Sequence, residues 1–181
     1  MKIGIAGVGG IGSNVAMYLV RAGFTKFKII DFDIITESNL NRQFFFKNQV
    51  GKYKVDMLKE NLENINGDII IEKEVLELTK DNMLEKFNNC NIIVEGFDIK
   101  ERKIELLEVF SNSNKLIVSA NGIGGLDLSN IVTKKLGKNI FIVGDFKSDI
   151  IDYKTYSTKV SIIAGTMANI IIEKHGVGVD N

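Results

Sequence analysis

Apolar residues occur along this chain in two patterns, as short continuous runs and as longer stretches with apolar positions every three or four residues. The short runs predict buried strands at about residues 3–8, 27–33, 69–72, 92–97 and 116–120. The longer stretches predict helices at about residues 11–22, 52–65, from 79 onward, 98–110 and 159–174. Strands and helices therefore alternate, which favours an α/β fold with a doubly wound, mostly parallel Rossmann-like sheet and right-handed crossovers.

The pattern changes after residue 120. Residues 128–134 and 140–143 predict two strands joined by a turn at residues 137–138, which together form an antiparallel hairpin. The helix at 159–174 is apolar on most sides, so we expect it to cover both the sheet and a partner subunit. Because the chain has no internal repeat or linker, we expect a single domain over residues 1–181.

The first predicted strand leads into a glycine-rich segment, Gly7-x-Gly9-Gly10-x-Gly12. Gly7 permits a tight turn, and Gly12 lets the next helix lie close to the strand. Gly9 and Gly10 let backbone N–H groups approach a phosphate. The next predicted strand ends at Asp31, a spacing at which a carboxylate hydrogen-bonds a ribose hydroxyl. The combination favours nucleotide binding over a purely structural glycine turn.

Further polar residues are expected at the same edge of the sheet. Ligands of such sheets bind beyond the carboxyl ends of the strands, where the strand order reverses. Asp31, Asp33 and Asp98 each follow a predicted strand, so they should face this crevice. Cys90 precedes a strand and belongs at the opposite edge, where we expect a partly buried thiol rather than a nucleophile.

The residues after Asp33 indicate which nucleotide is bound. They are rich in donors and cations, namely Asn39, Arg42, Gln43, Lys52 and Lys54. A hydride-transfer enzyme needs an apolar slot for nicotinamide, whereas these side chains suit a triphosphate, so ATP is favoured. Two alternatives stay open, an NAD-dependent oxidoreductase and a nucleotide-sensing or scaffold domain without turnover.

Composition narrows the choice of partners. The 23 basic and 23 acidic residues cancel, so no net field would attract nucleic acid or an anionic membrane. One histidine and one cysteine exclude a four-ligand zinc site and an internal disulfide. Residues 160–172 are too few to span a bilayer, which takes about 20 residues, and no signal-type segment precedes the first strand. We expect a cytoplasmic protein.

These motifs resemble those of the ThiF/MoeB/HesA family, adenylyltransferases related to ubiquitin-activating enzymes. The resemblance covers nearly the whole chain and is greatest to short ThiF-type proteins of thiamine biosynthesis, because of residues 143–148 and the late apolar helix. The motifs that carry it are Gly7-Val-Gly-Gly-Ile-Gly12, Asp31-Phe-Asp33, Ser38-Asn-Leu-Asn-Arg-Gln43, Gly51-Lys-Tyr-Lys54, and Gly96-Phe-Asp98 with Arg102.

The resemblance implies an activity and a partner. Such enzymes join the C-terminal glycine carboxylate of a ubiquitin-like sulfur carrier, here a ThiS-like protein with a Gly-Gly tail, to AMP and release pyrophosphate. The reaction moves no proton, so positioning and charge stabilisation suffice. A homodimer is also expected. By the family pattern Asp31 binds ribose, Gly10 and Asn39 border the nucleotide, Arg42 and Lys54 hold phosphate charge, and Asp98 positions Mg²⁺.

Simpler explanations compete for three of these residues. Asp98 and Glu101 fit a helix capping box, and Arg102 is spaced to pair with Asp98 across one turn. Lys54 on a helix fits an ordinary solvated charge.

The chain also departs from the family pattern. It lacks a CxxC pair, so the zinc site of longer relatives is not expected. Residues 147–158 hold no cysteine, so we expect no covalent adduct with the carrier. An N-terminal helix that would carry an arginine to a neighbouring subunit is also not expected, and Tyr53 replaces a proline.

Overall fold

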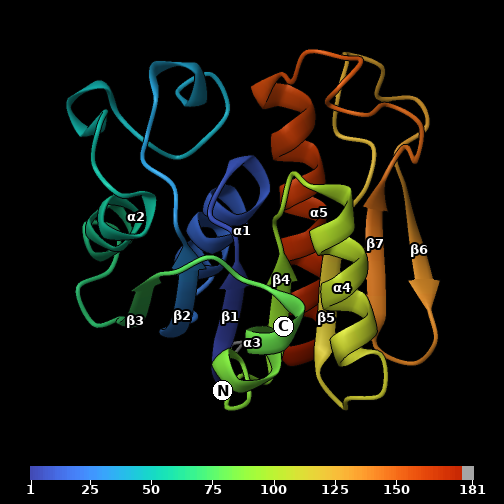
Figure 1. The fold of residues 1–181 in the computed structure, drawn as a ribbon, viewed down its shortest axis with the longest axis horizontal. Helices are drawn as coiled ribbons and strands as arrows, with labels where there is room; N and C mark the ends of the chain where they lie inside the picture. Colours follow the sequence, from blue (N-terminus) through green and yellow to red (C-terminus); the bar gives the residue numbers. More distant parts are fainter. Residues whose placement is uncertain (177–181) are drawn as a thin grey trace.

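The computed structural model describes residues 1–176, in which seven strands form one sheet. The strand order is β3-β2-β1-β4-β5-β7-β6 (Figure 1). The first six strands in this order run parallel, and β6 is antiparallel to β7. Chain order reverses between β1 and β4, so the predicted doubly wound, mostly parallel sheet with a C-terminal hairpin is confirmed.

The central strands are the most buried. β1, β4 and β5 are buried along their whole length, because helices cover both faces of the sheet. β6 forms one edge of the sheet, and all of its residues are exposed. The strands are β1 (Ile3–Ala6), β2 (Lys26–Asp31), β3 (Ile70–Val75), β4 (Ile92–Glu95), β5 (Leu116–Ala120), β6 (Val132–Leu136) and β7 (Ile140–Gly144).

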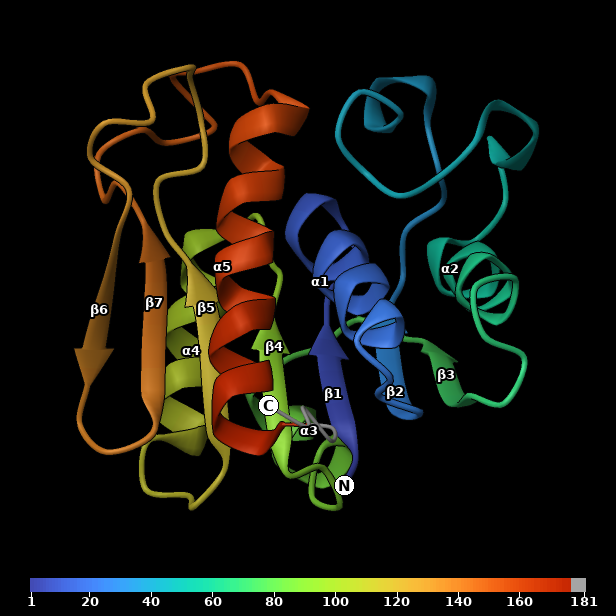
Figure 2. The same ribbon diagram turned by 180° about the vertical axis from the view of Figure 1, so that it is seen from behind.

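Helices form a layer on each face of the sheet. α1, α2 and α5 cover one face, and α3 and α4 cover the other (Figures 1 and 2). Each layer packs on its own apolar core. The helices are α1 (Gly10–Arg21), α2 (Lys54–Glu63), α3 (Lys80–Lys86), α4 (Lys100–Phe110) and α5 (Ser157–His175), with short 3-10 helices at Glu37–Asn39 and Lys47–Gln49. Among residues 1–176, no helix has both the length and the apolar character that crossing a bilayer requires.

The apolar composition of α5 is explained by contacts within the chain. Figure 2 shows α5 side by side with α1, and it also packs on β5 and β7. Val160, Ile163 and Met167 are buried, whereas Ile162 on the outer side is 43% exposed. The composition of this helix therefore gives no separate argument for a subunit interface.

Several predicted boundaries were wrong by a few residues, such as the strand expected at residues 69–72, which is β3 (Ile70–Val75). The hairpin begins at Val132 rather than residue 128, because Asp127 Oδ1 accepts hydrogen bonds from the N–H and hydroxyl of Ser129 and forms a local turn. The helix expected from Asp98 begins at Lys100. The end of the first helix matches the prediction, since Gly23 has φ +93° and donates its N–H to the carbonyl of Val20.

Candidate nucleotide-binding site

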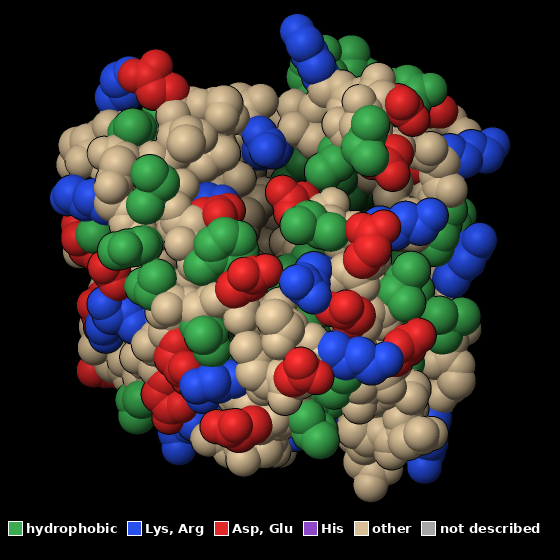
Figure 3. Space-filling view, in the orientation of Figure 1, with side chains coloured by type: hydrophobic (Ala, Val, Ile, Leu, Met, Phe, Trp, Pro, Cys, Tyr) green, Lys and Arg blue, Asp and Glu red, His purple; other side chains and the backbone are tan. Residues whose placement is uncertain are grey.

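A crevice of about 920 Å³ lies beyond the carboxyl ends of β1, β2 and β4. This is the point where the strand order reverses, as the sequence predicts. The space-filling view in Figure 3 is hollowed in its upper middle, and acidic and basic side chains are interspersed over the rest of this face. The walls come from the first glycine loop, residues 31–54, residues 76–78, residues 96–102 and residues 150–158.

The glycine loop has the geometry that its sequence predicts. Gly7 has φ +83°, and its N–H donates to the carbonyl of Ile30 at 2.9 Å. A Cβ atom on Gly12 would overlap the carbonyl oxygen of Gly7, so only glycine lets α1 start this close to β1. Gly9 and Gly10 line the crevice where α1 begins without a side-chain cap. The first N–H groups of α1 are therefore available at the crevice wall.

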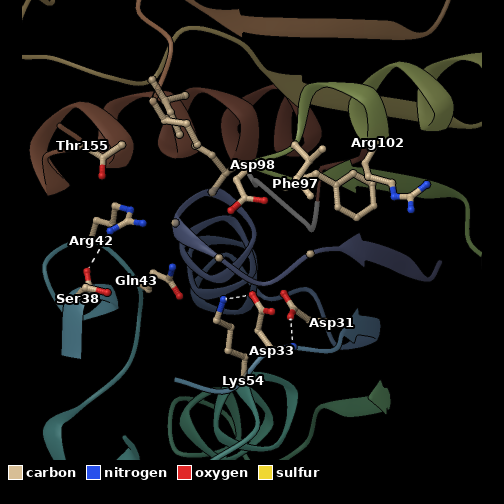
Figure 4. A pocket seen from close by; sticks show the side chains of 18 of the residues that line it. Asp31, Asp33, Ser38, Arg42, Gln43, Lys54, Phe97, Asp98, Arg102 and Thr155 are labelled. Atoms are coloured by element: carbon tan, nitrogen blue, oxygen red, sulfur yellow. Dashed lines mark hydrogen bonds and ion pairs between the residues drawn. The ribbon is translucent and has the colours of Figure 1, made fainter. Parts of the chain in front are cut away.

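Asp31 lies at the end of β2 and lines the crevice (Figure 4). Its Oδ2 accepts the N–H of Val8 at 2.7 Å, and its Oδ1 accepts the N–H of Asp33 at 2.8 Å. Burial raises the pKa of the Asp31 carboxyl, and the charge of Lys54 and the two N–H groups oppose this shift. Each carboxylate oxygen has a second lone pair, so Asp31 can still accept a ligand hydroxyl.

Lys54 is not an ordinary solvated charge. It is the first residue of α2, it is 6% exposed, and its Nζ lies 2.6 Å from Asp33 Oδ2. Both side chains line the crevice, and Figure 4 shows their ion pair at its centre. This pair fixes the position of the Lys54 ammonium group.

Arg42 faces the crevice without a carboxylate partner among the described residues. Its Nη1 donates to two neutral oxygens, the carbonyl of Ser38 at 3.1 Å and Asn41 Oδ1 at 2.8 Å. Its backbone is held because Asn14 Nδ2 donates to the carbonyls of both Arg42 and Gly10. The guanidinium is therefore positioned but not neutralised.

Gln43 is buried and lines the same wall as Arg42. Its Oε1 has no hydrogen-bond partner among the described residues. A buried acceptor without a donor is unfavourable, and such atoms are rare in folded proteins.

Asn39 does not line the crevice, although the sequence places it beside the nucleotide. Its Oδ1 accepts the N–H of Thr36 at 3.0 Å, and its carbonyl accepts the N–H groups of Arg42 and Gln43. Asn39 therefore shapes the turn that presents these two side chains. Gly12 also lies outside the lining and acts through the packing of α1.

Asp98 points into the crevice with an exposed carboxylate that has no hydrogen bond within residues 1–176 (Figure 4). The capping-box explanation is wrong, because the N-cap of α4 is Ile99 and it receives no side-chain bond. The pairing with Arg102 is also wrong. Arg102 Nη1 donates to Glu105 at 2.7 Å, and its Nη2 lies 3.2 Å from Glu77.

A buried ion pair that was not predicted from the sequence lies beneath the turn that carries Asp98. Glu95, at the end of β4, is fully buried, and Lys103 Nζ lies 3.0 Å from both of its carboxylate oxygens. Glu95 also accepts the N–H of Phe97 at 2.7 Å and the hydroxyl of Ser119 at 2.5 Å. The sequence did hold a sign of this pair, because Glu95 ends an otherwise apolar strand and a buried charge needs a partner of opposite charge.

A second missed cluster fixes residues 145–156, which we call the crevice loop. Lys159 is 1% exposed, and its Nζ donates to Asp145 Oδ2 and the carbonyl of Gly124 at 2.6 Å, and to Ser148 Oγ at 3.1 Å. Burial opposes ionisation of Asp145, but the hydrogen bonds from Lys159 and Ser148 outweigh it and hold its pKa below the usual value. The cluster ties the loop to α5.

Cys90 lies at the opposite edge of the sheet, before β4, as predicted. It is buried, and burial raises the pKa of its thiol to about 11. The thiol is therefore protonated at neutral pH and unsuited to nucleophilic attack.

Comparison with known proteins relates this chain to one family. The profile of the ThiF family matches residues 1–173. Ubiquitin-like modifier-activating enzyme 5 of Bombyx mori is 37% identical over 94 residues, which cover 52% of this chain and 23% of that protein. Adenylyltransferase and sulfurtransferase UBA4 of Candida glabrata is 32% identical over 124 residues, which cover 68% of this chain and 29% of that protein. The chain thus spans only about a quarter of the length of these relatives.

Solved structures with the same fold extend over almost all of this chain. E. coli tRNA N6-threonylcarbamoyladenosine dehydratase, solved in complex with AMP, has a TM-score of 0.87 at 18% identity, covering 96% of this chain and 85% of that chain. E. coli MccB has a TM-score of 0.78 at 23% identity, and the match covers 97% of this chain and 56% of that chain. At these identities the likeness concerns the fold.

Proposed function

The chain belongs to the ThiF family, and from this we propose that it is an ATP-dependent adenylyltransferase acting on the C-terminal glycine carboxylate of a ubiquitin-like carrier. The observation that carries the proposal is the graded polarity of the crevice. Leu76, Leu78 and Phe97 line one region of it, and the unneutralised Arg42 and the unpartnered Gln43 lie in another. Asp31 lies between them.

The change from apolar to charged side chains along the crevice follows the order of adenine, ribose and phosphates in ATP. In Figure 4 the labelled side chains run from Phe97 through Asp31 and Lys54 to Gln43 and Arg42. The apolar side chains suit the adenine ring, and Asp31 suits the ribose hydroxyls. The polyphosphate would then reach the first N–H groups of α1 and the Arg42 guanidinium.

A magnesium ion fits this site as a companion of the nucleotide. Within residues 1–176 no group of three or more His, Cys, Asp or Glu side chains is arranged to hold a metal. Mg²⁺ commonly binds through one or two carboxylates together with substrate phosphates. Asp98 offers such a carboxylate, facing the crevice and free of hydrogen bonds within the described chain. When bound, the ion would neutralise part of the phosphate charge.

The residues of the chain would act by position and charge. A carboxylate oxygen of the carrier attacks the α-phosphorus, and the bond to the bridging oxygen of pyrophosphate breaks. No proton is transferred, so no general base is required. Arg42 and Lys54 place fixed positive charge beside the phosphates, and the buried setting of Lys54 reduces its screening by water. Glu95 and Lys103 hold the turn that presents Asp98.

The finer parts of the proposal concern the partner. We propose a ThiS-like sulfur carrier with a Gly-Gly tail, because a tail without side chains fits between packed loops. A role in thiamine biosynthesis rests on the resemblance of residues 143–148 and α5 to short ThiF-type proteins. We also propose that residues 1–181 form one adenylyltransferase domain, that it acts as a cytoplasmic homodimer, and that it forms no covalent bond with the carrier.

Calorimetric titration is expected to show tighter binding of ATP with Mg²⁺ than of NAD. The reason is that Arg42 and Lys54 suit a triphosphate, whereas NAD carries only a diphosphate bridge. The same titration separates the adenylyltransferase from an oxidoreductase. Tighter binding of NAD, with no measurable heat for ATP and Mg²⁺, would refute the proposal.

Replacing Cys90 by serine is expected to leave the adenylation rate within about twofold of wild type. The thiol is protonated and lies at the edge of the sheet opposite the crevice, so no step uses it. Carrier adenylation by Cys90→Ser and Cys90→Ala, with circular dichroism as a folding control, provides the measurement. Two folded but inactive variants would contradict the assignment.

A further inference from the structure

The crevice loop contributes a cation that the proposed function leaves unused. Lys154 lines the crevice, and its side chain has no hydrogen bond or ion pair to any residue of the described chain. Two other crevice cations already have carboxylate partners, Lys54 with Asp33 and Arg102 with Glu77 and Glu105. Within residues 1–176, Arg42 and Lys154 are therefore the cations of the crevice wall that no carboxylate neutralises.

These two cations lie on facing segments that one residue joins. Asn41 Oδ1 accepts a hydrogen bond from Arg42 Nη1 at 2.8 Å, and Asn41 Nδ2 donates to the carbonyl of Thr155 at 3.3 Å. Thr155 directly follows Lys154 in the crevice loop. Figure 4 shows Thr155 near Arg42 at the same end of the crevice. Lys154 therefore belongs to the segment that Asn41 joins to Arg42.

The backbone around Lys154 is fixed. The carbonyl of Lys154 accepts the N–H of Gly125 at 2.8 Å, and the carbonyl of Ser148 accepts the N–H of Gly124 at 3.1 Å. A Cβ atom on Gly124 would lie only 2.8 Å from Tyr153 Cβ, so the two segments are closely packed. These contacts and the buried Lys159 cluster fix the backbone position of Lys154.

The region between the two segments is where the phosphates are proposed to lie. A Cβ atom on Gly10 would lie 3.4 Å from Val160 in the first turn of α5 and 3.6 Å from the Arg42 side chain. The start of α1, the start of α5 and Arg42 thus meet at one point. An ATP polyphosphate carries several negative charges, and beside Arg42 and the Asp33-paired Lys54 it can use a further free cation.

We infer that Lys154 is a second phosphate-binding residue, which holds the β- and γ-phosphates from the wall facing Arg42. The inference rests on the proposed function. As the carboxylate–phosphorus bond forms, the electrons of the breaking phosphorus–oxygen bond go to pyrophosphate. Lys154 stabilises that added charge as a point charge, and Arg42 stabilises it by directed hydrogen bonds.

The test compares Lys154→Ala with a matched lysine of the same loop. Lys147 is exposed and does not line the crevice, so Lys147→Ala is the control. ATP and AMP, each with Mg²⁺, are titrated calorimetrically into wild type and both variants. Lys154→Ala should bind ATP about tenfold or more weakly and AMP within about twofold of wild type, because AMP lacks the β- and γ-phosphates. Lys147→Ala should match wild type for both ligands.

Other results of these titrations would contradict the role of Lys154. ATP affinity equal to wild type in Lys154→Ala would overturn the inference, as would an equal loss for ATP and AMP, which would indicate a general disturbance of the loop. Unchanged nucleotide binding with a raised KM for the carrier would assign Lys154 to the carrier instead. Wild type that binds neither nucleotide would overturn the proposed function itself, so the two failures are distinguishable.

Discussion

Replacing Asp98 by alanine is expected to lower the rate of carrier adenylation by about a hundredfold or more, the usual loss when a charged contact to the transition state is removed. The carboxylate faces the crevice and makes no hydrogen bond within residues 1–176. Removing this carboxylate should therefore change the free energy of unfolding little. The proposed Mg²⁺–nucleotide complex, in contrast, would lose a carboxylate ligand. Single-turnover adenylation of a carrier with saturating ATP measures the effect.

Two further variants control for charge and position. Asp98→Asn keeps the size of the side chain and should show a similar loss, because the charge is what matters. Glu101→Ala removes a nearby exposed carboxylate that does not line the crevice and should stay within about twofold of wild type. A folded Asp98→Ala enzyme working at the full rate would contradict the role given to this residue.

Replacing Gly12 by alanine is expected to destabilise the fold by about 2 kcal/mol or more, as overpacking of a closely packed site does. The added Cβ atom would overlap the carbonyl oxygen of Gly7, a backbone atom that cannot rotate away. It would also lie 3.0 Å from Ile5, so α1 would have to move away from β1. Urea unfolding followed by circular dichroism measures the change in free energy.

Gly67 is the matched control for this variant. It lies in the turn after α2, and a Cβ atom there would meet nothing within 4 Å. Gly67→Ala should change the free energy of unfolding by no more than about 0.5 kcal/mol. If Gly12→Ala were as stable as Gly67→Ala, the close approach of helix and strand would not be what requires glycine here.

Features set by neighbours in sequence were predicted well. The turn at Gly7 and the start of α1 depend on residues within one strand–turn–helix unit, and Asp31 ends the strand that directly follows it. The alternation of apolar runs likewise predicted the order of strands and helices. Boundaries were predicted less well, and the start of β6 moved because a local turn at Asp127 competed.

Features set by partners far along the chain were not predicted. Arg102 pairs with Glu77, 25 residues away, and Lys159 contacts Gly124, 35 residues away. No spacing rule links such residues. Asn39 lies outside the crevice lining for a different reason. An asparagine can either face a ligand or bond nearby backbone, and here its Oδ1 accepts the N–H of Thr36.

Carrier-dependent exchange of labelled pyrophosphate into ATP tests the central proposal most directly. The assay contains the full chain, ATP, Mg²⁺ and a ThiS-like carrier ending in Gly-Gly, and the same carrier without its last glycine is the control. Label is expected in ATP when the carrier is intact, but not when the carrier is truncated or when the enzyme is Asp98→Ala. A folded wild-type chain that binds ATP yet shows no carrier-dependent exchange would contradict it.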